Sequence, residues 1–224
     1  PCKIYWSSRE RGAFEVGGIG VADAIEGKGP AAHAEIFGYM EDRLSADNPH
    51  LRYYGGMSFN GTTTGGDWQN LGGYRFIIPR FELLNTGEQT MFAFNIAFKD
   101  INPENIGAIL KDLEVIDFSA VTTYRRPPKV LRRADFPDRQ GWEEAFARTK
   151  AADGKFRYDK IVLARKSVFD FDVYINPTAL MKHLKDKTPQ CFHFCFQTDK
   201  TTAFLGASPE RLYKRTGNTI ETEA

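Results

Sequence analysis

Two segments of the chain carry side chains that could transfer protons. Lys160 opens the run Lys-Ile-Val-Leu-Ala-Arg, which ends at Arg165. A lysine acts as a base near neutral pH only if its pKa falls well below about 10.4, and burial in an apolar sheet has this effect. The apolar neighbours of Lys160 would suit such a base. The alternative is a lysine that ends its strand in solvent, where most lysines lie.

Glu210 follows the segment Gly206–Pro209, a tight Gly-Ala-Ser-Pro approach that would place it at the start of a strand. A glutamate can donate a proton if desolvation or a nearby anion raises its pKa. The alternative is an ion pair with Arg211 or with another arginine. The distance between Lys160 and Glu210 does not follow from their separation along the chain.

Two other patterns could bind a metal or a phosphate, but each has a simpler interpretation. In a strand, Cys191, His193 and Cys195 would share one face. A fourth ligand is not evident, and three ligands along one strand fit a tetrahedral site poorly, so a core strand is favoured. The run Gly17–Gly20 lacks the lysine and the serine or threonine of a phosphate-binding loop, which favours a turn.

The elements that must position these residues are mostly strands, with four helices between them. Strands are predicted over residues 14–16, 51–59, 73–78, 90–98, 158–168, 191–197, 202–205 and 210–214, with a hairpin turn at 85–87 and a loop at 61–67. Helices are predicted over 30–44, 103–113, 141–152 and 177–184, and prolines open the first, second and fourth. The sequence therefore predicts an α+β fold with antiparallel-rich sheets and helices packed outside.

A connector at residues 124–128 divides this pattern. We expect a sheet-rich N-terminal part over 1–126 and a second part over 127–224. The strand-like alternation at 220–224 halts without a turn and would need a partner that the sequence does not visibly provide. Both ends therefore look like cuts.

The 224 residues have a net charge of +1, which supplies no field to attract nucleic acid or an anionic membrane and favours a small substrate. No apolar run approaches the roughly 20 residues of a membrane span, and the first residues are unlike a secretory signal. Three cysteines, an odd number, do not describe a disulfide framework. A cytoplasmic protein is expected.

Several segments, in their order and spacing, resemble the isochorismate synthase branch of the chorismate-utilising enzyme family. These are Lys160–Arg165, Gly206–Leu212, Tyr53–Phe59, Phe76–Leu83 and Glu221–Ala224, the last resembling the start of that branch's Thr-Glu-Ala-Leu-Ala-Gly-Thr motif. The resemblance covers nearly the whole chain and is to the N-terminal portion of such an enzyme. It makes residues 127–224 the start of the chorismate-binding catalytic part.

The resemblance also implies a reaction. Chorismate is attacked at C2 while its C4 hydroxyl leaves. Lys160 would activate water, since members that use ammonia, such as anthranilate synthase, place glutamine there, and Glu210 would protonate the leaving hydroxyl. Mg²⁺ is the implied cofactor, with its carboxylate ligands beyond position 224, so a missing C-terminal polypeptide is the expected partner. The terminal motif favours menaquinone biosynthesis.

Two other functions stay open. A salicylate synthase uses the same lysine-activated water and then eliminates pyruvate. A non-catalytic remnant could instead serve as an interaction module that retains Lys160 and Glu210 without a metal site.

Overall fold

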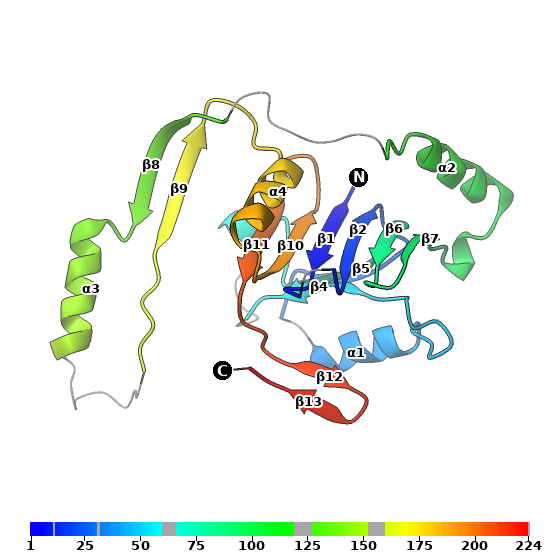
Figure 1. Ribbon diagram of the computed structural model, residues 1–224, viewed down its shortest axis with the longest axis horizontal. Coiled ribbons are helices and arrows are strands. Elements are labelled where there is room, and N and C mark those ends of the chain that lie inside the picture. The colour runs from blue at the N-terminus through cyan, green and yellow to red at the C-terminus, as the bar shows by residue number, and fades with distance from the viewer. Residues whose placement is uncertain (11, 31, 60–65, 119–126, 152–159, 224) are drawn as a thin grey trace. The chain divides into compact units, whose positions relative to one another are not determined.

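The computed structural model describes residues 1–10, 12–30, 32–59, 66–118, 127–151 and 160–223, which form two compact units (Figure 1). Unit 1 comprises residues 1–121 and 177–224, and unit 2 comprises residues 122–176. The sequence placed the boundary between an N-terminal part and the start of the catalytic part at residues 126 and 127. This boundary stays a prediction. Among the described residues, no helix is both long and apolar enough to cross a membrane.

Unit 1 is built on two antiparallel sheets. The larger has the order β11-β10-β1-β2-β6-β7, and the smaller has the order β3-β5-β4. The strands of the larger sheet are β1 (Lys3–Ser7), β2 (Glu15–Ile19), β6 (Phe81–Asn85), β7 (Thr90–Phe94), β10 (Phe192–Gln197) and β11 (Ala203–Ser208). Those of the smaller are β3 (Asp23–Gly27), β4 (Tyr54–Met57) and β5 (Tyr74–Ile78). A hairpin of β12 (Lys214–Thr216) and β13 (Thr219–Glu221) follows.

The core of unit 1 joins the two sheets. Ile4, Val16 and Leu84 of the larger sheet cluster with Ile77 of the smaller one, and all four are buried. Strand β1 pairs with β2 and also with β10, so Trp6 lies opposite both Val16 and Phe194. This pairing brings the beginning and the end of the chain into one sheet.

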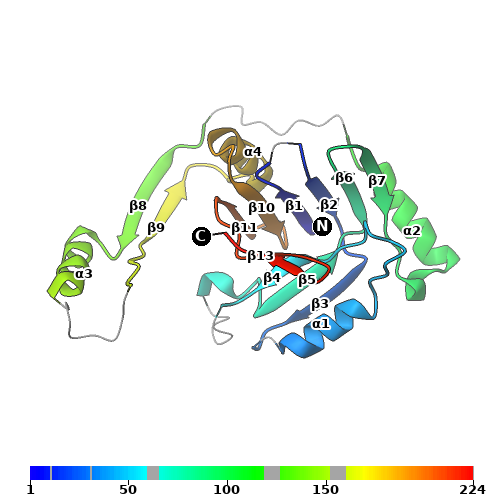
Figure 2. The same ribbon diagram turned by 60° about the horizontal axis from the view of Figure 1, so that its bottom comes forward.

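Helices α1 (His33–Glu41), α2 (Pro103–Glu114) and α4 (Pro177–Lys187) belong to unit 1, with short 3-10 turns at Gly66–Trp68 and Phe98–Asp100. Helix α1 lies along β3 (Figure 2), where the Tyr39 hydroxyl donates to Asp23 Oδ1 at 3.0 Å. Helix α2 begins where the Asn102 side chain accepts from the Asn105 amide. Helix α4 packs on β10 and β11 and buries Met181.

Unit 2 consists of the antiparallel pair β8 (Val130–Phe136) and β9 (Lys166–Phe171) and helix α3 (Arg139–Ala151). Phe136 pairs with Lys166 at one end of the ladder and Val130 with Phe171 at the other. None of the described residues of this unit is buried.

The α+β class, the antiparallel sheets and the four helices are confirmed. The predicted strand over 158–168 is corrected: residues 158 and 159 lie outside the described residues, 160–165 form no ladder, and the strand begins at Lys166. The predicted strand over 210–214 is also wrong, because β12 starts only at Lys214. Also outside the described residues are 61–65 of the predicted loop, 124–126 of the predicted connector, and residue 224.

Two expectations about turns are corrected too. Gly17 and Gly18 belong to β2, and only Gly20, with a φ of +73°, forms the turn. Glycine is required at position 18, since a Cβ there would lie 2.6 Å from Pro79 Cγ. The last strand does have a partner, because Gly217 at a φ of +59° turns the chain so that β13 pairs with β12.

Candidate active site

Glu210 lies in unit 1, two residues beyond the end of β11. Glycine at position 206 allows β11 to lie this close to the aromatic ring of its ladder partner in β10. A Cβ at that position would lie 2.6 Å from the ring of Phe194. The Ser208 hydroxyl then donates to the backbone carbonyl of Glu210 at 3.1 Å, which turns the chain. The Glu210 side chain is exposed, and within the described residues it forms no ion pair.

The arginine next to it has another partner. Arg211 pairs with Oε1 of Glu223, while Nη1 of Arg9 lies 2.6 Å from Oε2 of the same carboxylate. Arg9 Nη1 also donates to the backbone carbonyl of Pro209 at 3.1 Å. Both guanidinium groups lie over the ring of Phe192, at 5.5 and 5.9 Å from its centroid. The ion pair between Glu210 and Arg211, considered from the sequence, is therefore replaced by one between Arg211 and Glu223.

Lys160 lies in unit 2, where it is exposed. Its neighbours Ile161 and Val162 are 49% and 77% exposed, so the expected burial in an apolar sheet is not present in this structure. At the other end of the segment, Arg165 Nε lies 3.9 Å from Asp135 Oδ1 as the chain enters β9. Lys160 and Glu210 belong to different units, and their meeting stays a prediction.

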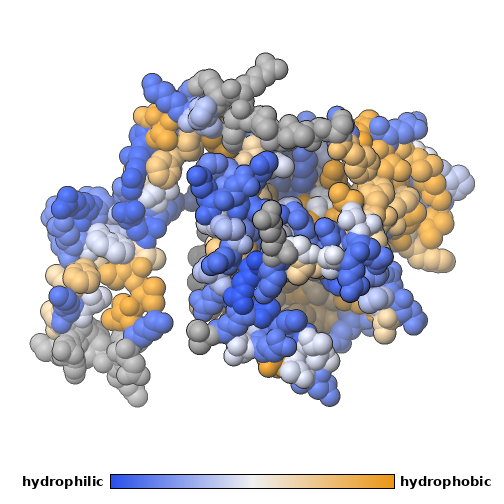
Figure 3. Space-filling model, viewed as in Figure 1, coloured by the Kyte–Doolittle hydropathy of each residue, from blue (hydrophilic) through white to orange (hydrophobic). Residues whose placement is uncertain are grey.

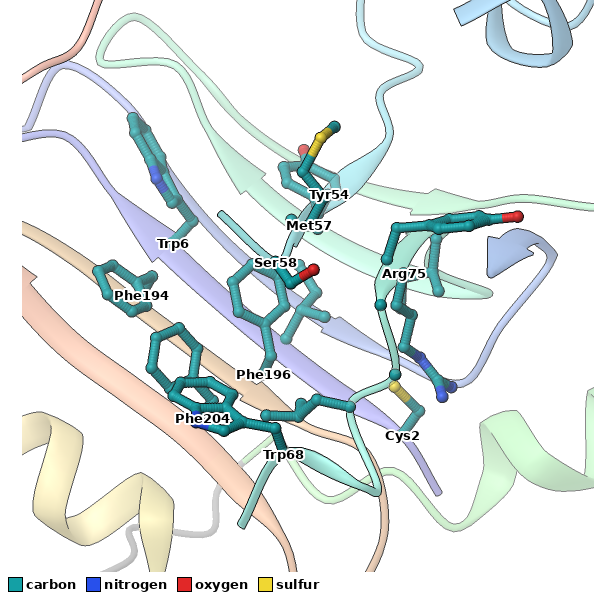
Figure 4. Close-up of a pocket in the computed structure, with 18 of the residues that line it drawn as sticks. Cys2, Trp6, Tyr54, Met57, Ser58, Trp68, Arg75, Phe194, Phe196 and Phe204 are labelled. Carbon is teal, nitrogen blue, oxygen red and sulfur yellow. The ribbon is translucent and has the colours of Figure 1, made fainter. Parts of the chain in front are cut away.

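Unit 1 also contains an apolar cavity of about 640 Å³ (Figure 4). Its walls come from both sheets, with Trp6, Phe194, Phe196 and Phe204 from the larger, Tyr54, Met57 and Arg75 from the smaller, and Cys2, Ser58 and Trp68 beside them. Among the described lining residues the only cation is Arg75, which is paired with Glu26 at 3.0 Å. Among the described residues that line the cavity, neither Lys160 nor Glu210 is present.

The buried histidine of β10 has structural partners. His193 is 2% exposed, with Nε2 3.0 Å from the Thr188 hydroxyl and Nδ1 3.4 Å from that of Ser7, and burial lowers its pKa. His193 therefore lies in a core strand with Cys195, as predicted from the alternation of Cys191, His193 and Cys195 in the sequence. The described residues contain no group of three or more histidine, cysteine or carboxylate side chains that could hold a metal. They do not fit Mg²⁺, which needs several oxygen ligands.

Sequence reasoning missed the arrangement around Glu223. A signal for Glu223 was its place in the segment that resembles the Thr-Glu-Ala motif. Arg9 gave no such signal, because it lies about 200 residues from Pro209 and meets it only through the pairing of β1, β10 and β11.

The comparisons with known proteins agree with this fold. Residues 2–224 match the family described as "Chorismate binding enzyme". The chain therefore belongs to the chorismate binding enzyme family. It is 26% identical to the chloroplastic isochorismate synthase of Catharanthus roseus over 99% of this chain and 40% of that protein. It is 30% identical to the isochorismate synthase MenF of Bacillus subtilis over 81% of this chain and 39% of that protein.

The solved structure of MenF, the menaquinone-specific isochorismate synthase of Escherichia coli, has the same fold. The TM-score is 0.73 at 21% identity, covering 96% of this chain and 46% of that one. The chain thus spans less than half the length of these relatives.

Proposed function

We propose that the chain is the N-terminal part of an isochorismate synthase and that it supplies the base and the acid of the reaction. The observation that carries the proposal is the family match over residues 2–224, which includes both Lys160 and Glu210 in their characteristic segments. The names of the relatives favour isochorismate as the product, and the bacterial ones favour a role in menaquinone biosynthesis.

In the proposed reaction, neutral Lys160 takes a proton from water as the water oxygen bonds to C2 of chorismate. The two ring double bonds shift, the C4–O bond breaks, and Glu210 donates its proton so that the hydroxyl leaves as water. The unpaired carboxyl group of Glu210 supports this role. An adjacent guanidinium bound to it would favour the ionised form, which cannot donate.

We further infer that a second polypeptide segment, either the continuation of this chain or a separate chain, completes the enzyme and pairs with the segment 160–165. Figure 3 shows apolar side chains on unit 2 between α3 and this segment, and Ile161 and Val162 are among the exposed ones. An added strand would satisfy the backbone of the segment and bury its apolar side chains. Burial would also bring Lys160 toward the neutral form that a base requires.

Mg²⁺ in the complete enzyme would be held by carboxylates of that second polypeptide. Its contribution when bound would be to neutralise and orient a carboxylate of the substrate. The carboxylate of Glu223 is already paired with Arg9 and Arg211.

The test is product analysis with chorismate, using this chain alone and together with a C-terminal isochorismate synthase polypeptide from the same genome. Isochorismate formed only by the mixture supports the proposal, and salicylate would assign a salicylate synthase instead. A stable complex without turnover would favour the interaction module. Hydrogen exchange of 160–165 in the same mixture should slow on binding, whereas exchange within β10 should not change.

A further inference from the structure

We propose that Arg9 and Glu223 are positioning residues for Glu210: Arg9 fixes the turn that carries it, and Glu223 keeps two guanidinium groups away from its carboxyl group. The inference rests on the proposed role of Glu210 as the acid, and it assigns a function to two residues that do not touch the reacting atoms.

The first part concerns position. Arg9 stands two residues beyond β1, and Pro209 stands one residue beyond β11, with β10 between these strands. The hydrogen bond from Arg9 to the Pro209 carbonyl therefore ties together the ends of two strands that do not pair with each other. It acts on the residue directly before Glu210, so it limits the directions in which the Glu210 side chain can leave the backbone.

Arg9 is itself held in place. The amide of Ser8 donates to the carbonyl of Phe14 at 2.9 Å, and the amide of Phe14 donates back to the Ser8 hydroxyl at 3.2 Å. Below the guanidinium group lies the ring of Phe192, which is 9% exposed and begins β10. An arginine with a fixed backbone, an aromatic support and two acceptors is preorganised, so it loses little further freedom when the turn forms.

The second part concerns charge. The charged groups around the turn are Arg9, Arg211, Glu223 and Glu10, whose carboxylate lies 3.4 Å from Arg9 Nε. Both oxygens of Glu223 are occupied by the two arginines, one by each. Without this carboxylate, Arg211 would lose the one ion-pair partner it has among the described residues, and the adjacent Glu210 would be available to it. An ion pair there would hold Glu210 ionised and remove its proton.

The activity test uses the complete enzyme. Arg9→Ala and Glu223→Gln should each lower kcat by about 10- to 100-fold with little change in KM, the scale expected for a misplaced reactive group. Arg9→Lys should recover part of the loss, since it keeps the charge but not the two-pronged geometry. The matched control is Glu26→Gln, which breaks the pair with Arg75 away from this turn and should leave kcat unchanged. Equal losses in the control, or none in Arg9→Ala and Glu223→Gln, would overturn the inference.

A second test needs only this chain. The carboxyl carbon of Glu210 is followed by NMR through an acid titration, and its midpoint should move to lower pH by about one unit in Glu223→Gln, because an arginine then reaches it. An unmoved midpoint refutes the charge separation. If the midpoint moves as expected but Glu210→Gln retains full kcat in the complete enzyme, the proposed acid role fails while the arrangement around Glu223 stands.

Discussion

The two units of the chain differ in how well their described side chains are buried. Unit 1 buries Val16 and Leu84 almost completely between antiparallel sheets. Unit 2 has one strand pair and one helix, and none of its described residues is buried. Its ion pairs, such as Arg132 with Asp170 at 2.7 Å, are largely exposed, and such pairs contribute about 0–1 kcal/mol each.

This difference separates the two candidate catalytic residues. Glu210 is anchored to the well-packed unit, where Arg9 and Glu223 hold its surroundings. Lys160 lies on unit 2, whose described residues include no buried side chain, beside apolar side chains that are exposed to solvent. In our proposal the acid is thus placed by this chain, whereas the base is placed only when another polypeptide covers unit 2.

The strongest consequence is that the chain by itself should neither bind Mg²⁺ tightly nor convert chorismate. The described residues lack the oxygen ligands that the ion needs, and without them the substrate carboxylate is not oriented. Isothermal titration with Mg²⁺ and with chorismate, followed by product analysis, measures both. Turnover by the purified chain alone would contradict the separation of acid and base described above.

The next effect concerns the two residues in the complete enzyme. Lys160→Ala and Glu210→Gln should each lower kcat by about 100-fold or more, the scale for a positioned acid or base, with a modest change in KM. The fold should remain, because both side chains are exposed in this chain. A near-normal kcat would remove the residue concerned from the mechanism, and a change in KM alone would assign it to binding.

The sequence predicted several of the strands of unit 1. Strands β5, β7 and β10 alternate clearly and lie within the predicted ranges. Strands β1, β3 and β8 were missed. Strand β3 ends in Glu26 and Gly27 and β8 carries two arginines, whereas β1 has strand-forming residues in Ile4–Trp6 and was overlooked. Pairing with neighbours stabilises β3 and β8 despite their composition.

The segment that begins at Lys160 shows the opposite error, since a strand was predicted there and none forms. This segment has the composition of a strand, but strand propensity does not supply a ladder partner, and residues 160–165 have none within the part of the chain that the structure describes. At Glu210 the alternative interpretation, an ion pair with Arg211, is not what the structure shows, for a related reason. The competing carboxylate, Glu223, is brought near by the β12 and β13 hairpin, which sequence separation does not reveal.

A smaller effect compares the stability of the units through two leucines. Leu84 is 1% exposed in unit 1, and Leu131 is 63% exposed in unit 2. Leu84→Ala should lower the free energy of unfolding by about 2–5 kcal/mol, whereas Leu131→Ala should change it by less than about 0.5 kcal/mol. Urea unfolding followed by tryptophan fluorescence measures both. A large effect of Leu131→Ala would mean that unit 2 does have a core of its own.

The smallest effect is the pH dependence of an ion pair that fastens α4 to the larger sheet. Lys185 Nζ lies 2.6 Å from Glu15 Oε1 and 2.7 Å from the Tyr5 hydroxyl. Burial favours the neutral form of Glu15, but the hydrogen bonds from Lys185 and Tyr5 outweigh it and lower the pKa of Glu15 below its usual 4.5. The ionised form is therefore stabilised by folding.

Because the pKa of Glu15 is lower in the folded state, its contribution is complete above about 4.5 and is lost as the pH falls through the folded value. The free energy of unfolding should decrease on acidification, and Lys185→Met should reduce this decrease by less than about 1 kcal/mol, since the pair is partly exposed. Ser167→Ala is the matched control, because Ser167 lowers the pKa of Asp135 in unit 2 instead. If the control reduced the acid dependence of the main unfolding transition as much as Lys185→Met does, that transition would include unit 2, and the contrast between the units would fail.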